Sequence, residues 1–160
     1  MSIQKVKDYF AKFGIQNRIR ELSDSSATVQ LAALALGTKE QRIAKTLSFW
    51  VNDLPILIVT AGDVKIDNAK YRAFFGQKAK MIDFDSVETT IGHGVGGVCP
   101  FAINQSVKVY LDDSLKRFET IFPACGSANS AIELTPQELQ DYCQNFNAWI
   151  DVCKLKEQNQ

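Results

Sequence analysis

The feature that most constrains this chain is its glycine-rich stretch at residues 92–101, which reads Gly-His-Gly-Val-Gly-Gly-Val-Cys-Pro-Phe. Four of the nine glycines of the chain fall within six positions there, and glycine loses more backbone entropy on ordering than any other residue. Without Cβ atoms, backbone amides can approach a ligand closely or line an anion-binding concavity. Pro100 fixes its own φ and keeps Cys99 extended, which defines the exit of the loop. The stretch is therefore either a ligand contact or a tight connection between packed elements.

Length and charge place the chain among single-domain globular proteins. Its 160 residues suffice for one domain with a real core, and we treat residues 1–160 as that domain. Hydrophobic residues make up 46% and charged residues 22%, which is typical of a globular chain. Lys plus Arg equal Asp plus Glu at 18 each, so a polyanion would have to be held by a local patch. We find neither a membrane-spanning run nor a signal peptide, and we expect a cytoplasmic protein without a membrane partner.

Cysteine and histidine are too few and too scattered to predict a metal site. The four cysteines include no Cys-x-x-Cys pair and His93 is the only histidine, so we expect no metal and no cofactor. His93 lacks an obvious carboxylate to orient it and is interpreted as a loop histidine rather than a catalytic base. Cys99 and Cys125 are interpreted as packed residues rather than nucleophiles, because a reactive thiol needs electropositive surroundings. Cys143 and Cys153 fall on the apolar stripe of the last expected helix.

Hydrophobic spacing predicts several short helices. The second of them starts near Ser26 or Thr28 and is closed by Gly37. The last is the clearest, because a Thr-Pro-Gln-Glu capping signature at residues 135–138 precedes a long apolar stripe. We expect helices at residues 3–13, 28–36, 38–44, 67–75, 85–91 and 135–153.

Strand patterns are interleaved with these helices. We expect strands at residues 17–22, 46–51, 55–60, 107–111, 118–122 and 131–134. The 55–60 segment is apolar on both faces, which is typical of a central strand, and Asn52-Asp53 forms the turn before it. The mixed order of elements, with no repeat or linker, predicts an α+β fold: a single domain with a mixed, barrel-like β-sheet surrounded by short helices.

Lys45 is the side chain most easily linked to chemistry. It lies where the expected helix 38–44 gives way to the strand 46–51, with Ala44 and Leu47 nearby as in a core. A lysine directed into a pocket there would suit a phosphate or a polarised carbonyl. The alternative is a solvated lysine at a helix C-terminus, where the helix dipole favours a cation.

Three segments, occurring in this order, carry a resemblance to a known family. They are Ile43-Ala44-Lys45-Thr46-Leu47-Ser48-Phe49, the loop Gly96-Gly97-Val98-Cys99-Pro100-Phe101, and Gly126-Ser127-Ala128-Asn129 ahead of Leu134-Thr135-Pro136. Together they resemble the YbaK/EbsC family, the free-standing relatives of the editing domain inserted in bacterial prolyl-tRNA synthetase. The resemblance runs from about Ile3 to Tyr142. Cys99 departs from it where serine or another small residue is usual, and His93 where an aromatic or aliphatic residue is typical.

The resemblance implies a function and a site. Its members hydrolyse the ester that links a wrong amino acid to the 3′ end of a tRNA, which here implies small residues such as Ala, Ser, Thr or Cys on tRNA(Pro) or a related tRNA. The implied partners are the aminoacyl-tRNA acceptor end and an aminoacyl-tRNA synthetase. The implied catalytic residue is Lys45, and the implied substrate-binding residues are Thr28, Gly94, Gly96, Gly97, Val98, Cys99, Pro100, Phe101, Gly126, Ser127 and Asn129.

The residues fit that chemistry without a metal or a covalent intermediate. An aminoacyl ester is already activated, so a positioned water can attack it. Backbone amides of the glycine-rich loop would stabilise the developing oxyanion, while Lys45 would bind the terminal phosphate or assist electrostatically. The competing function is a non-catalytic module that binds tRNA ends or nucleotides, or docks on a synthetase, with the same pocket.

Overall fold

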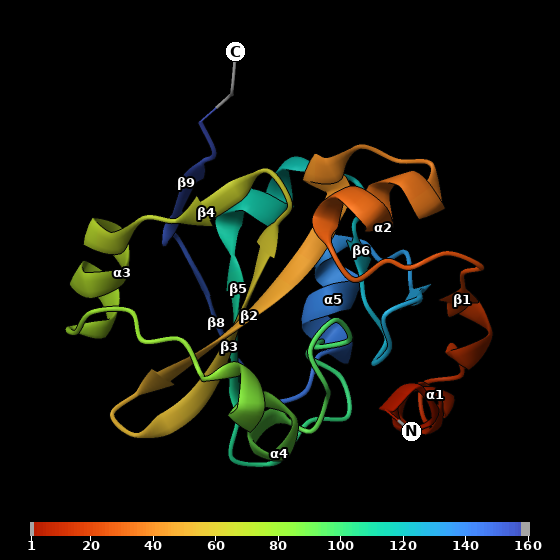
Figure 1. Ribbon diagram of the computed structural model, residues 1–160, viewed down its shortest axis with the longest axis horizontal. Coiled ribbons are helices and arrows are strands. Elements are labelled where there is room, and N and C mark those ends of the chain that lie inside the picture. Colours follow the sequence, from red (N-terminus) through yellow and green to blue (C-terminus); the bar gives the residue numbers. More distant parts are fainter. Residues whose placement is uncertain (1, 158–160) are drawn as a thin grey trace.

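A mixed five-stranded sheet with the order β6-β2-β3-β5-β8 forms the centre of the protein (Figure 1), and the structure, a computed structural model, describes residues 2–157. Strands β2 (Ile43–Val51) and β3 (Leu54–Ala61) form an antiparallel hairpin. Its turn is Asn52-Asp53, and both residues have positive φ, as a tight hairpin turn requires. Strands β6 (Phe122–Pro123), β5 (Lys108–Asp112) and β8 (Phe146–Ile150) each pair in parallel with their neighbours.

Two small antiparallel sheets flank the central one. Strand β1 (Arg20–Glu21) pairs with β7 (Ser130–Ala131), and β4 (Val64–Ile66) pairs with β9 (Cys153–Leu155). The central sheet curls into a half-barrel. The predicted α+β class and the mixed, barrel-like sheet of a single domain are therefore confirmed.

Short helices surround the sheet, as predicted. Thr28 caps α2 by accepting a hydrogen bond from the Leu31 amide, and Gly37 ends it in the left-handed conformation. A complete capping box of Thr135 and Glu138 starts α5. The α-helices are α1 (Ser2–Ala11), α2 (Val29–Leu36), α3 (Asn68–Phe75), α4 (Val87–Ile91) and α5 (Pro136–Tyr142); the 3₁₀-helices are η1 (Gln16–Arg18), η2 (Glu40–Arg42), η3 (Phe84–Ser86) and η4 (Asp113–Arg117). In the described part of the chain, none of these helices has the length and apolarity to cross a membrane.

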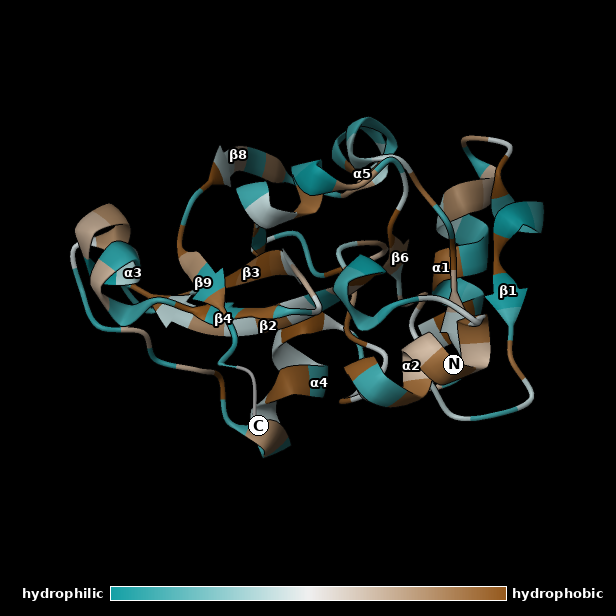
Figure 2. Ribbon diagram, turned by 90° about the horizontal axis from the view of Figure 1, so that it is seen from above, coloured by the Kyte–Doolittle hydropathy of each residue, from teal (hydrophilic) through white to brown (hydrophobic). Residues whose placement is uncertain are grey.

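The core is built around β3. Every residue of this strand after Leu54 is buried, which confirms the prediction of a central strand at residues 55–60. Figure 2 shows β3 as a largely hydrophobic strand in the interior of the molecule. Side chains of α1, α3, α4 and α5 pack on the same cluster through Phe10, Tyr71, Ile91 and Leu139. The sheet is thus held from several sides, and the walls of any site on it have fixed positions.

The predicted last helix is wrong beyond Tyr142. Residues 146–150 form β8 and residues 153–155 form β9. The chain turns at Asn145, whose φ is +56° and whose side-chain amide donates to the carbonyls of Gln105 and Val107. Pairing with β5 and β4 satisfies backbone groups that a longer helix would have satisfied internally. Cys143 and Cys153 are buried as expected, although neither lies within a helix.

The predicted helix at residues 38–44 is also wrong. Only the single 3₁₀ turn η2 forms there, without a side-chain cap, and β2 begins at Ile43. Lys45 is therefore the third residue of a strand rather than a residue at a helix end. The tertiary pairing of Ala44 with Ala61 on one side and Pro123 on the other overrides the local helical signal.

Three predicted strands are shorter than expected. Of residues 131–134 only Ala131 belongs to a strand, β7. Of residues 17–22 only β1 is extended and paired, after the η1 turn. Of residues 118–122 only Phe122 belongs to a strand, and Ile121 forms an isolated bridge with Leu134.

Candidate functional site

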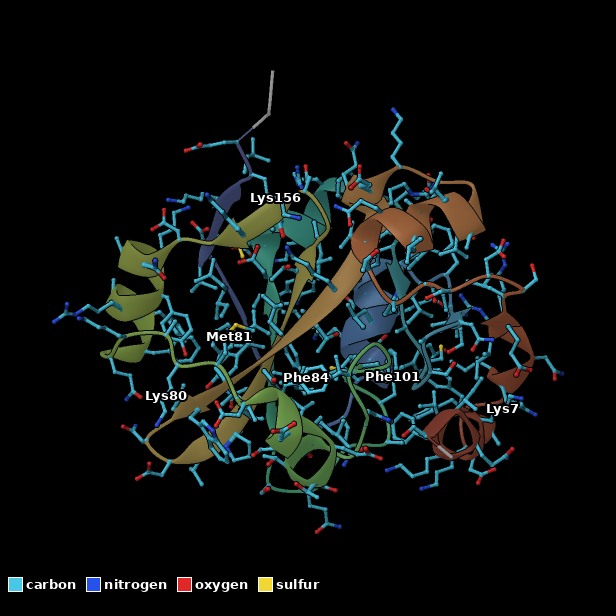
Figure 3. All side chains as sticks on the ribbon, in the orientation of Figure 1. Lys7, Lys80, Met81, Phe84, Phe101 and Lys156 are labelled. Atoms are coloured by element: carbon cyan, nitrogen blue, oxygen red, sulfur yellow. The ribbon has the colours of Figure 1, made fainter. Side chains whose placement is uncertain are left out.

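A cavity of about 390 Å³ lies along β2, between α2, the segment that joins α3 to α4, and the glycine-rich loop. In Figure 3, Met81 and Phe84 mark the α3–α4 segment where it crosses β2. The walls are mostly apolar, with hydroxyl groups from β2, from β7 and from the segment that leads into α2. The lining residues are Ser26, Ala27, Thr28, Val29, Ala32, Leu36, Ile43, Ala44, Lys45, Thr46, Leu47, Ser48, Met81, Ile82, Phe84, Val87, Val95, Gly96, Val98, Phe122, Ala124, Ser130 and Ala131.

Consecutive residues of β2 reach this cavity because one edge of the strand is open. On that edge β6 pairs with β2 only at Ile43 and Ala44, and the next backbone hydrogen bond runs from the Ile82 amide to the Ser48 carbonyl. Within the described chain, residues 45–47 have no strand partner there. Side chains from both faces of β2, together with its backbone edge, therefore border the same space.

Lys45 is the only charged residue among those that line the cavity in the described chain. Its side chain is half-buried, and Nζ donates a hydrogen bond to the carbonyl of Val64 in β4. Burial, and after it the neighbouring Lys156 charge, lowers the pKa of Lys45 to about 8. An ammonium in apolar surroundings interacts with an anion more strongly than one in water does.

The glycine-rich loop presents only part of itself to the cavity. The Gly97 amide donates to the Gly94 carbonyl at 3.1 Å, which closes a tight turn. Gly96 takes the third position with φ +93°, the left-handed conformation that a type II turn needs there. Gly96 and its neighbours Val95 and Val98 line the cavity, whereas Gly97 packs against the backbone of Gly126.

The structure brings four of the twelve sequence-predicted site residues to the cavity wall: Thr28, Lys45, Gly96 and Val98. The other eight lie behind or beside the wall. Cys99, Pro100 and Phe101 are buried in the core, Gly94 and Gly97 belong to the turn, and Gly126, Ser127 and Asn129 form the loop behind it. Ser127 still acts on the wall, because its Oγ donates to Oγ of the lining residue Ser130 at 2.7 Å.

His93 and Cys99 form a buried pair away from the cavity. His93 is fully buried, and its Nε2 lies 2.6 Å from the Phe101 carbonyl and 3.5 Å from Sγ of Cys99. Burial lowers the pKa of His93 and raises that of Cys99 to about 12, so both groups are neutral at pH 7. Burial likewise raises the pKa of Cys125. These thiols are packed, as predicted from the sequence.

Sequence reasoning missed several hydroxyl groups at the cavity. Ser26, Thr46 and Ser130 line it, and the Ser26 and Thr46 hydroxyls are buried without a hydrogen-bond partner in the described chain. Thr46 follows Lys45 directly, so the signal was present in the motif, but strand alternation assigned the two side chains to opposite faces. Residues 2–157 contain no group of three or more His, Cys, Asp or Glu side chains that could hold a metal ion.

Comparisons with known proteins identify a family and a close relative in sequence. A family model described as an aminoacyl-tRNA editing domain matches residues 23–142. The uncharacterized protein YwhH of Bacillus subtilis (strain 168) is 52% identical over 155 residues, which cover 96% of this chain and 98% of that protein.

Solved structures show the same fold. A candidate trans-editing enzyme for prolyl-tRNA synthetase superposes with a TM-score of 0.81 at 25% identity, covering 98% of each chain. A scaffold protein from computational epitope grafting superposes with a TM-score of 0.83 at 25% identity, covering 99% of this chain and 98% of that one.

Proposed function

Because this chain belongs to the aminoacyl-tRNA editing domain family, we propose that it is a deacylase, which hydrolyses the ester between a wrong amino acid and the 3′ end of a tRNA. The observation that carries the proposal is the position of Lys45. Among the described residues, it is the one cation on the wall of a mostly apolar cavity that the glycine-rich loop also lines. Such a site suits a neutral aminoacyl side chain next to an anionic or polarised group.

In the proposed reaction, the amino acid side chain enters the cavity and the ester lies near Lys45. A water attacks the ester carbonyl, whose oxygen gains negative charge in the transition state. Lys45, which is mainly protonated at pH 7 with a pKa of about 8, supplies a positive charge to that oxygen or to the terminal phosphate. The backbone near Gly96 and Val98 supplies the hydrogen-bond donors.

The proposed hydrolysis is a direct attack of water on the ester and needs no covalent intermediate with the protein. The oxygen of the water forms a new bond to the carbonyl carbon, the bond from that carbon to the ribose oxygen breaks, and a proton from the water ends on the ribose hydroxyl. The products are the free amino acid and the uncharged tRNA. Neither His93 nor Cys99 takes part, because both are buried and neutral.

Selectivity in this proposal depends on the walls of the cavity. Small residues, among them Ala32, Ala44, Ala124 and Ala131, leave room for small noncognate side chains such as those of alanine, serine, threonine and cysteine. One missing methylene changes binding by only about 1–3 kcal/mol, so several small esters should be hydrolysed. The proline ring fixes its own amine, and we expect prolyl-tRNA to be spared.

A deacylation panel tests the proposal. Alanyl, seryl, threonyl, cysteinyl and prolyl esters of tRNA(Pro) are incubated with the protein, with and without prolyl-tRNA synthetase, and ester loss is measured. We expect hydrolysis of the small noncognate esters and none by Lys45→Ala. Tight binding of every tRNA without turnover would identify a non-catalytic module instead, and rapid hydrolysis of prolyl-tRNA alone would contradict the assigned selectivity.

A further inference from the structure

The C-terminal strand β9 lies outside the range 23–142 that the family model matches, yet it pairs with β4, the strand that contains the hydrogen-bond partner of Lys45. Lys45 Nζ donates to the carbonyl of Val64, and Val64 pairs directly with Leu155 of β9. Because β4 is only three residues long, its position depends on this pairing. The residues after position 142 therefore affect the geometry of the proposed catalytic side chain.

Lys156, the residue after β9, fastens the turn between β3 and β4. Its Nζ donates to the Gly62 carbonyl at 3.1 Å, and its backbone amide donates to the Asp63 carbonyl at 2.9 Å. Figure 3 shows Lys156 beside β4 at the end of β9. Two consecutive carbonyls that lead into Val64 are thus held by one residue.

The turn has little freedom to move in other directions. A Cβ at Gly62 would lie 2.0 Å from the Glu40 carbonyl oxygen, so the turn is in close contact with the backbone just before β2. On its far side, the Asp63 carboxylate accepts two hydrogen bonds from Arg117, at 2.6 and 3.1 Å. Lys156 completes this set of contacts from the third side.

The charged and titratable groups around the Lys45 ammonium come from three elements. They are Lys156 after β9, Cys153 within β9, and Asp63 in the β3–β4 turn. Burial and nearby carboxylates raise the pKa of Cys153, so its thiol is neutral. The charge of the Asp63 carboxylate is partly offset by its ion pair with Arg117. Among these groups, Lys156 has the largest electrostatic effect on the Lys45 ammonium.

We infer that Lys156 is a positioning residue for Lys45: it fixes the turn that carries the Val64 carbonyl and places a second positive charge beside the Lys45 ammonium. The inference rests on the proposed function, in which Lys45 is the catalytic cation. Two like charges this close repel each other, and this repulsion favours the neutral form of Lys45. The C-terminal strand β9 then helps to position the catalytic side chain, in addition to its pairing with β4.

Three variants of the 160-residue chain distinguish the effects of charge, contact and fold. Lys156→Gln removes the charge, Lys156→Arg keeps a positive donor, and Lys154→Gln removes an equivalent charge from β9 whose side chain is exposed. Each protein is labelled with ¹³C at the lysine Cε, and the Lys45 signal, assigned by its loss in Lys45→Arg, is followed from pH 6.5 to 11. The kcat and KM for the preferred ester are measured over the pH range in which the ester is stable.

In Lys156→Gln we expect the Lys45 titration to move to higher pH, since the repelling charge is gone. We also expect kcat at pH 7.5 to fall about threefold to tenfold with little change in KM, because misplacement of a catalytic group mainly affects the transition state. Lys156→Arg should restore both values, and Lys154→Gln should resemble the wild type. The limb of the pH profile of kcat that follows deprotonation of Lys45 should move to higher pH together with the Lys45 signal.

A Lys45 titration in Lys156→Gln that matches the wild type would overturn the inference, as would an equal shift in Lys154→Gln. A fall in kcat that Lys156→Arg does not restore would also overturn it. If the wild type hydrolyses no ester at all, the proposed function fails, and the titration of Lys45 still decides whether Lys156 acts on it.

Discussion

Gly97 and Gly126 lie back to back, so that a Cβ at position 97 would come within 2.5 Å of the Gly126 carbonyl carbon. The contact joins the glycine-rich loop to the loop at residues 126–129, which lies 29 positions further along the chain. Gly126 is itself packed against the backbone of Ser2, where its own Cβ would lie 2.7 Å from a carbonyl oxygen. The two glycines are thus needed for close packing behind the cavity.

The first prediction concerns this packing. Gly97→Ala should lower the free energy of unfolding by about 2 kcal/mol or more, because backbone atoms cannot move aside as a flexible side chain can. The matched control is Gly94→Ala in the same loop, where the nearest atom would be the Glu88 carboxylate at 3.7 Å and φ is not positive. Urea denaturation of the two variants measures the difference. Equal stability of Gly97→Ala and Gly94→Ala would contradict this account.

Gly97→Ala should also lower the rate of deacylation more than Cys99→Ser does. Gly97→Ala displaces the wall formed by Gly96 and Val98, so its turnover should fall at least tenfold, while Cys99→Ser should lose less because the thiol is neutral and takes no part in the reaction. A dead Cys99→Ser protein beside an active Gly97→Ala protein would instead indicate thiol chemistry.

The fold was predictable wherever local signals and tertiary contacts agree. The buried run at residues 55–60, the Asn52-Asp53 turn and the cap at Thr28 all have short-range causes, and the structure confirms them. The apolar stripe from Leu139 to Cys153 has helical spacing, yet residues 146–150 pair with β5, which lies about 40 positions earlier. No property of the segment itself encodes that pairing, so the prediction of one long helix failed.

The second prediction uses the low basicity of Lys45. Its ordinary pKa of 10.5 applies in the unfolded chain, and burial lowers it to about 8 in the folded protein. Between pH 8 and 10.5 the unfolded chain therefore binds more protons, so the Lys45 contribution to stability increases as the pH rises through that window. Below pH 8 both states are protonated, and the full penalty for burying the charge remains.

Lys45→Met removes this dependence. The free energy of unfolding of the wild type, relative to that of Lys45→Met, should increase from pH 8 to pH 10.5 and stay level below pH 8. Paired urea titrations at four pH values measure the difference. The contributions of the other titratable groups to the free energy of unfolding cancel in it. A flat difference across the window would show that the amine has an ordinary pKa.

The third prediction concerns His93, whose Nδ1 is buried without a hydrogen-bond partner in the described chain. Burial lowers its pKa below the ordinary value of 6.5, so the unfolded chain binds the proton more readily. Stability from His93 is therefore complete above pH 6.5 and is lost as the pH falls below that value. His93→Gln cannot be protonated, and its stability should decline less between pH 7 and pH 5. Its kcat profile near neutral pH should match the wild type, whereas a proton-transfer role would change it.

The candidate site was less predictable than the fold, for a geometric reason. The motif residues around Lys45 and Gly96 mark the cavity, but the local patterns around Ser26, Phe84 and Ser130 do not show that these side chains reach it. The open edge of β2 exists because β6 is only two residues long and starts at Phe122, nearly 80 positions away. Sequence patterns describe the faces of a strand, and they do not reveal which part of an edge remains free.

The last prediction concerns the hydroxyl of Thr46, which is buried at the cavity wall and has no hydrogen-bond partner among residues 2–157. A buried hydroxyl without a partner destabilises the free protein, and Thr46→Val replaces it with a methyl group of similar shape. We expect the free energy of unfolding to rise by about 1 kcal/mol. The control is Thr60→Val in β3, where the buried hydroxyl donates to the Ala61 carbonyl at 3.2 Å and its loss should destabilise. If the Thr46 hydroxyl is kept for the substrate, Thr46→Val should also raise KM about fivefold to tenfold, which corresponds to one hydrogen bond. A more stable protein with an unchanged KM would show that the substrate does not use this hydroxyl.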